Sequence, residues 1–159
     1  MNDNPTDLLS NTQPLASLSD RLAASLLDVL IMVIIIAVPL FLIYGFDDAL
    51  RMLSQEDILH TVTKLAFGQI VFLLVQGRLL YKYGQTIGKR YLDIRIVDLN
   101  NNLPSFGRVY ALRYLLGMSV LPAVPIIGGL FSLVDTLFVF RSDRRCIHDL
   151  IAGTKVVAA

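Results

Sequence analysis

Two aspartates lie in stretches that otherwise suit the interior of a lipid bilayer. Asp28 is inside an almost continuous apolar run from Leu22 to Tyr44, and Asp135 is inside the last apolar run of the chain. A carboxylate at the centre of a membrane helix costs about 2.5–3.5 kcal/mol or more, so it needs a cationic partner or a wet cavity. Arg21 lies seven residues before Asp28 on the same helical face, and Arg113 is expected at a comparable depth.

Two buried carboxylates suggest one kind of chemistry and one structural alternative. In a cavity of low dielectric, Asp28 and Asp135 would have raised pKa values, so that a proton and a cation compete for one site. Binding of a cation would then expel a proton, which is the minimum that exchange requires. Alternatively, Arg21 and Arg113 neutralise the two aspartates and only hold the helices together. The sequence leaves both interpretations open.

A glycine-containing segment, Gly84-Gln85-Thr86-Ile87-Gly88-Lys89, raises the question of phosphate binding. It does not have the Walker A spacing, because three residues rather than four separate Gly84 from Gly88-Lys89. We expect a tight turn instead, in which the two glycines supply the backbone conformations. Lys89 and Arg90 would then contact anionic lipid headgroups.

His148 and Asp149 invite a metal or catalytic interpretation. A single histidine beside one aspartate does not make a metal site when His60 is expected on the opposite membrane face. No nucleophile occurs together with a base, so we expect neither an enzyme nor a cofactor. We expect His148 and Asp149 to lock the inner surface, with Asp149 paired to an arginine.

Composition places these residues in a small polytopic membrane protein. The chain has 159 residues, of which 55% are hydrophobic and 17% are charged, and its mean hydropathy is +0.63. These values exclude a soluble enzyme. The net charge of +1 gives no reason to expect a nucleic-acid partner. The single cysteine, Cys146, excludes a disulfide within the chain and suits the reducing side of a membrane.

The predicted fold class is an all-α membrane protein with four transmembrane helices and a small cytoplasmic β element. The last two helices are expected to be short and joined at Pro122 and Pro125. A flexible cytoplasmic tail over residues 1–19 should precede a membrane domain over 20–159. The expected helices cover residues 20–45, 58–82, 105–121 and 126–140. The expected strands cover residues 91–98 and 154–157, with the second pairing with the first.

The distribution of charge predicts the topology. The segment 82–108 and the tail 141–159 are rich in Lys and Arg, whereas the connector 45–57 is acidic. By the positive-inside rule, both termini are cytoplasmic and the protein lies in the cell (inner) membrane. Alternatively, 105–140 contains one amphipathic helix and one span, which would place the basic tail outside. Four short helices enclose little volume, so we expect a homo-oligomer.

The combined motifs resemble those of the RDD family, small bacterial and archaeal membrane proteins named for one arginine and two aspartates. Arg21, Asp28 and Asp135 match these three residues. The segment containing Gly84, Thr86, Gly88 and Lys89 resembles the family's G-x-T-x-G-K. The closing H-D-x-x-A-G-T-x-V-V is matched by a segment that contains His148, Asp149, Gly153 and Thr154.

The resemblance extends from Arg21 to Val157, nearly the whole chain. It implies a small membrane protein, and some family members are linked to cation/proton antiport. One hypothesis is therefore a transporter that exchanges sodium, potassium or lithium for protons through Asp28 and Asp135. The other is a non-catalytic membrane scaffold or accessory subunit with a structural Arg/Asp network.

Overall fold

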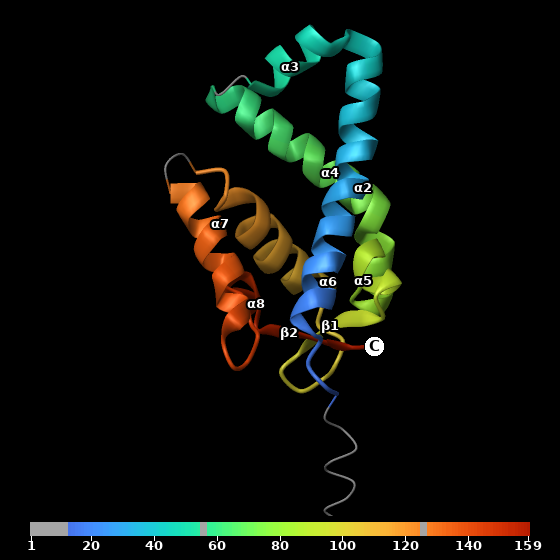
Figure 1. Ribbon diagram of the computed structural model, residues 1–159, viewed down its shortest axis with the longest axis vertical. Helices are drawn as coiled ribbons and strands as arrows, with labels where there is room; N and C mark the ends of the chain where they lie inside the picture. Colours follow the sequence, from blue (N-terminus) through green and yellow to red (C-terminus); the bar gives the residue numbers. More distant parts are fainter. Residues whose placement is uncertain (1–12, 55–56, 125–126) are drawn as a thin grey trace, which may run out of the picture.

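Two long helices, α2 (Leu18–Tyr44) and α4 (Ile58–Tyr83), are joined by a short helix, α3 (Phe46–Ser54), at one end of the molecule (Figure 1). Both are long and apolar enough to cross a membrane. Their bounds agree with the first two predicted helices to within two residues. The computed structural model describes residues 13–54, 57–124 and 127–159.

Side chains and a glycine fix the ends of these helices. The hydroxyl of Ser17 accepts the backbone N–H of Asp20 at 3.0 Å at the start of α2. The carboxylate of Asp57 accepts the N–H of His60 at 3.0 Å at the start of α4. Both are N-caps that satisfy a free helical donor. Helix α4 ends at Gly84, whose φ of +65° favours glycine.

The two long helices do not form a closed bundle within one chain. In each helix, none of the most apolar 18-residue stretch is buried, and Leu42 and Leu74 are about four-fifths exposed, at 80% and 79%. In Figure 1, α2, α3 and α4 outline an open triangle. The architecture is therefore mostly helical with two long apolar helices, and their outer faces have no protein partner among the described residues.

The third apolar region forms a hairpin. Its first arm consists of α6 (Phe106–Arg108) and η1 (Val109–Val120), and its second consists of α7 (Ile127–Leu137) and the 3₁₀ turn η2 (Phe138–Phe140). Figure 1 shows that the chain turns back between the two arms. Pro122 lies in the connecting turn, as expected. Pro125 and Ile126 lie outside the described residues.

The hairpin differs from the prediction of two spanning α-helices. Helix η1 is a π-helix, and the N–H of Leu121 donates to the carbonyl of Leu116, five residues earlier, at 3.0 Å. The first arm covers 106–120 and the second covers 127–140, close to the predicted bounds, and each rises about 23 Å or less at about 1.5 Å per residue. A hydrocarbon core is about 30 Å thick, so neither arm is long enough to cross it alone.

A two-stranded antiparallel sheet closes one end of the molecule. β1 (Ile94–Asp98) pairs with β2 (Thr154–Ala158), with Ile96 opposite Val156. This confirms the predicted β element, although β1 begins three residues later than expected because 91 ends a helix and 92–93 form a turn. The sheet, with the short helices α5 (Ile87–Tyr91) and α8 (Ile147–Ala152), is called the cap below.

The start of the chain joins the cap. Leu15 forms an antiparallel bridge with Val157, and the N–H of Ala16 donates to the carbonyl of Val156 at 3.1 Å. The predicted flexible tail over 1–19 therefore ends in a segment that is attached to the sheet, and residues 1–12 lie outside the described residues. As a result, the start of α2 and both ends of the hairpin meet at the cap.

Candidate functional site

Asp149 is the centre of a buried ion-pair network in the cap. Its carboxylate has no exposed surface and forms ion pairs with Arg21 at 2.5 Å and with Arg113. The hydroxyl of Thr154 donates to the same carboxylate at 3.3 Å. The side chains of Arg21 and Arg113 are only 8% and 3% exposed. A buried carboxylate is tolerated when opposite charges and hydrogen bonds surround it in this way.

This network corrects the expected pairing of the arginines with Asp28 and Asp135. Asp149, which was expected to pair with an arginine, binds both Arg21 and Arg113. The reason is their separation along α2: seven residues of helix rise about 10 Å, so Arg21 and Asp28 meet different parts of the cap, Arg21 the start of α8 and Asp28 the start of α5. The carboxylate at the start of α8 is therefore within reach of Arg21, and Asp28 has other partners.

Asp28 is bound by the segment that contains the two glycines. The hydroxyl of Thr86 donates to one carboxylate oxygen at 2.5 Å, and the N–H of Gly88 donates to the other at 2.8 Å. The Lys89 ammonium is 3.8 Å from the carboxylate. A Cβ at Gly88 would collide with the carbonyl oxygen of Ala24, so only glycine permits this approach.

The turn thus binds an anion, but the anion belongs to the same chain. Thr86 also caps the start of α5, where free N–H groups favour negative charge. Lys89 was expected to face lipid headgroups, but it is 8% exposed and directed at Asp28. Arg90 remains exposed, with its guanidinium 4.9 Å from the centre of the Tyr83 ring.

Asp135 pairs with His148. The N–H of His148 donates to one carboxylate oxygen at 2.9 Å, and Nδ1 of its ring is 2.7 Å from the other. Burial, with a further contribution from the charge of Arg113, lowers the pKa of His148 to about 4. The imidazole is therefore neutral near pH 7, and we assign the Nδ1 proton as a donor to Asp135. A Cβ at Gly117 would lie 2.7 Å from the Cβ of His148, so this contact also needs a glycine.

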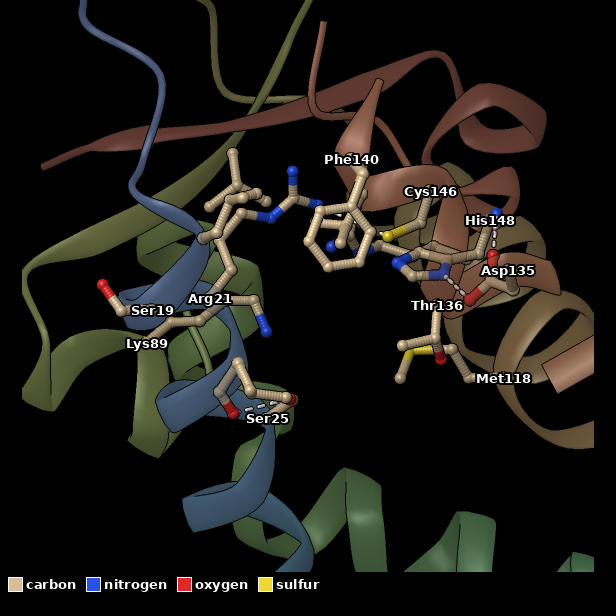
Figure 2. A pocket seen from close by; sticks show the side chains of 15 residues that line it. Ser19, Arg21, Ser25, Lys89, Met118, Asp135, Thr136, Phe140, Cys146 and His148 are labelled. Atoms are coloured by element: carbon tan, nitrogen blue, oxygen red, sulfur yellow. Dashed lines mark hydrogen bonds and ion pairs between the residues drawn. The ribbon is translucent and has the colours of Figure 1, made fainter. Parts of the chain in front are cut away.

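A cavity of about 370 Å³ lies between the first turns of α2 and the end of α7. Figure 2 shows Arg21 and Lys89 on one side of it, and Asp135, Cys146 and His148 on the other. Asp135 therefore faces the cavity, whereas Asp28 is not among the residues that line it. Of the two aspartates singled out in the sequence, only Asp135 is placed to meet a ligand there.

The remaining predicted positions shape the cap. Gly84 and Gly153 end α4 and α8 with φ of +65° and +61°. The hydroxyl of Thr154 accepts a hydrogen bond from Arg113 at 3.1 Å in addition to its bond to Asp149. These residues hold the network in place and do not line the cavity.

Cys146 is the residue that sequence reasoning missed. Ligand atoms of Cys146, His148 and Asp135 all lie within 4.8 Å of one another, although no metal site was expected from the sequence. Burial raises the pKa of the Cys146 thiol. The available signal was the spacing of a cysteine two residues before a histidine. Asp135, the third residue of the cluster, is too far from Cys146 in the sequence for the spacing to indicate it.

Comparisons with known proteins agree with the motifs. The model of the RDD family matches residues 15–153. The uncharacterized protein YckC of Bacillus subtilis is 35% identical over 140 residues, which cover 87% of this chain and 82% of YckC. An uncharacterized protein of Haemophilus influenzae is 36% identical over 93 residues, which cover 57% of this chain and 55% of that protein, about half its length. No solved structure matches.

Proposed function

Because this chain belongs to the RDD family, we propose that it is a multi-pass protein of the inner membrane that acts as a non-catalytic scaffold or accessory subunit. The observation that carries this proposal is the pairing of Asp149 with two arginines, with no part of the carboxylate exposed. Asp28 likewise has a hydroxyl, an N–H and an ammonium group as partners. Carboxylates paired in this way stabilise a structure and are poor sites for exchange.

Membrane placement is supported by the two long helices and by the cap. The pairing of β1 with β2 and the bridge from Leu15 to Val157 support a topology in which both ends of the hairpin and the start of α2 are on one side of a bilayer. In the proposed topology, α2 and α4 cross, and the hairpin enters from the cytoplasm and returns. The basic segments are then cytoplasmic, in keeping with the positive-inside rule. The same pairing favours this topology over a single span in the hairpin.

The partner surface in this proposal is the basic face of the cap. Exposed cations lie on the cap and on the segments that lead into it: Arg90 is on α5, and Lys82, Arg108 and Arg141 are at the ends of α4, α6 and η2. Basic side chains next to a transmembrane helix attract anionic headgroups by about 1 kcal/mol each. We propose that this face binds anionic lipid, and that a second copy of the chain covers part of the exposed faces of α2 and α4.

A second candidate function is the exchange of monovalent cations for protons, and one observation favours it. Among the buried carboxylates of the described residues, Asp135 lines the cavity, and it is bound to a histidine rather than to an arginine or a lysine. A cation in the cavity would therefore reach Asp135 more readily than Asp28 or Asp149. This candidate limits the predicted exchange to one of the two predicted sites.

Flux in proteoliposomes distinguishes the two functions. The purified chain would be reconstituted with a trapped pH dye, and Na⁺, K⁺ or Li⁺ would be added in turn. The scaffold predicts no proton movement in the wild type, and a lower unfolding temperature for Asp28→Asn. Exchange predicts a cation-dependent pH change that is lost in Asp135→Asn and kept in Asp57→Asn, a control at the far end of α4. A cation-dependent signal in the wild type would refute the scaffold as the whole function.

A further inference from the structure

We propose that Asp135, Cys146 and His148 form a binding site for a thiophilic divalent metal ion of the Zn²⁺ type. Their ligand atoms lie within 4.8 Å of one another, in the wall of the cavity. Asp135 comes from α7, Cys146 immediately precedes α8, and His148 lies in its first turn. This site goes beyond the proposed function, because it holds whether or not the chain moves ions.

The geometry is near what such an ion requires. Zn²⁺ binds sulfur at about 2.3 Å and nitrogen or oxygen at about 2.0–2.2 Å in a tetrahedron, so its ligand atoms are roughly 3.3–3.8 Å apart. The three ligand atoms lie within 4.8 Å of one another, so shifts of about 1 Å are needed. Nδ1 of His148 is 2.7 Å from the Asp135 oxygen, so an ion bound to both atoms would replace this hydrogen bond, and the ring proton would move to Nε2. Asp135 and His148 are already joined by two hydrogen bonds, and their side chains are only 13% and 9% exposed.

The ligand types select the class of ion. A thiolate and an imidazole favour Zn²⁺ and the neighbouring transition metals, whereas Na⁺, Mg²⁺ and Ca²⁺ prefer oxygen ligands. The thiolate of Cys146 and the carboxylate of Asp135 together balance a divalent charge. The guanidinium of Arg21 is 4.0 Å from the sulfur of Cys146. Because burial keeps this thiol protonated in the metal-free protein, binding of the ion would release the thiol proton.

The surroundings leave one coordination position open. The cavity of about 370 Å³ adjoins the three ligands, so a water molecule can complete a four-coordinate site of the kind that has three protein ligands. Asp149 offsets one of the two positive charges of Arg21 and Arg113 through its two ion pairs. These pairs reduce the repulsion that two nearby arginines would exert on a metal ion.

Cobalt binding tests the proposal directly. Co²⁺ would be titrated into the full chain in detergent micelles while the near-ultraviolet charge-transfer band of a cobalt–thiolate bond is recorded. We expect a band that saturates at one equivalent, disappears when Zn²⁺ is added, and is absent in Cys146→Ser. Asp135→Asn should weaken Co²⁺ binding at least tenfold. His60→Ala, which alters a second His–Asp pair at the start of α4, should change neither the cobalt–thiolate band nor the affinity for Co²⁺.

A second measurement uses the wild-type chain, so it does not depend on how a variant folds. Cys146 is the chain's one cysteine, and its alkylation by a maleimide can be followed without interference. We expect Zn²⁺ to slow alkylation of the wild type at least tenfold, and to slow it much less in His148→Ala. Absence of the cobalt band from the folded wild type, or an alkylation rate that Zn²⁺ leaves unchanged, would overturn the site.

Discussion

Replacing Asp149 by asparagine removes the charge that holds two arginines and keeps the size of the side chain. The carboxylate has no exposed surface, and Arg21 and Arg113 are 8% and 3% exposed. The Asp149→Asn variant would therefore have two buried guanidinium groups that have lost their shared ion-pair partner, with little water around them. The amide oxygen of the new side chain still accepts a hydrogen bond, but it contributes no charge.

The expected loss of stability is large. Removing one partner of a buried ion pair costs about 3–5 kcal/mol, and here one carboxylate serves two cations. We therefore expect Asp149→Asn to lower the free energy of unfolding by at least about 3 kcal/mol. A domain has only about 5–15 kcal/mol of stability in total, so the cap of this variant should be open in a measurable fraction of molecules.

Equilibrium unfolding in detergent micelles, followed by circular dichroism, measures this loss. Asp143→Asn is the matched control, because its ion pair with Arg141 at 3.3 Å is solvent-exposed and should cost about 1 kcal/mol or less. The double variant Arg113→Gln/Asp149→Asn should be more stable than the sum of the two single changes indicates, since it removes one unpaired cation. A loss below about 1 kcal/mol for Asp149→Asn would refute the reasoning.

Three further changes test the contacts of the cap in the same unfolding assay. Thr86→Val removes the hydroxyl that donates to Asp28 at 2.5 Å, and should cost about 1–3 kcal/mol, whereas Thr86→Ser should cost less. Gly88→Ala places a methyl group against the carbonyl of Ala24 and should cost about 1–3 kcal/mol. Gly153→Ala forces alanine into a φ of +61° and should cost about 1–2 kcal/mol. Wild-type stability in any of these variants would show that its contact is unimportant.

The long helices and the sheet could be predicted because their signals are local. The apolar run after Asp20 is longer than a soluble helix needs, and the alternation around Ile94 and Ile96 has the period of a strand. Pairing of β1 with β2 also follows from two short strands that belong on the same side of a membrane. These features depend on periodicity and length, which a single sequence shows directly.

The hairpin and the end of the tail could not be predicted in the same way. The apolar run from Val109 to Phe140 looks long enough for two crossings. Its sequence indicates neither the π-helical hydrogen bonding of η1 nor the short length of this helix. Leu15 and Ala16 were included in the predicted flexible tail because the residues around them are polar. Their attachment to β2 depends on a sheet edge formed by the far end of the chain.

The sequence drew attention to most of the paired residues of the cap, but not to Cys146, and it did not predict which residues pair. Arg21, Asp28 and Asp135 were expected to bind one another, but each binds a residue from another motif instead: Asp149, Thr86 and His148, respectively. Periodicity shows which residues share one helix face, but it does not show which neighbouring element lies opposite. That choice depends on tertiary packing, and so does the approach of Cys146 to Asp135.

The length of chain between Arg21 and Asp149 bears on the order of events during synthesis. The two residues are 128 positions apart, whereas Asp28 is only 58 positions from Thr86. At about 5–20 residues per second, a ribosome needs roughly 6–26 seconds to make the residues between Arg21 and its partner. During that interval the first helix has already been synthesised, but Arg21 does not yet have its ion-pair partner. A chain released early would therefore expose an unpaired arginine to the cell's quality-control proteases.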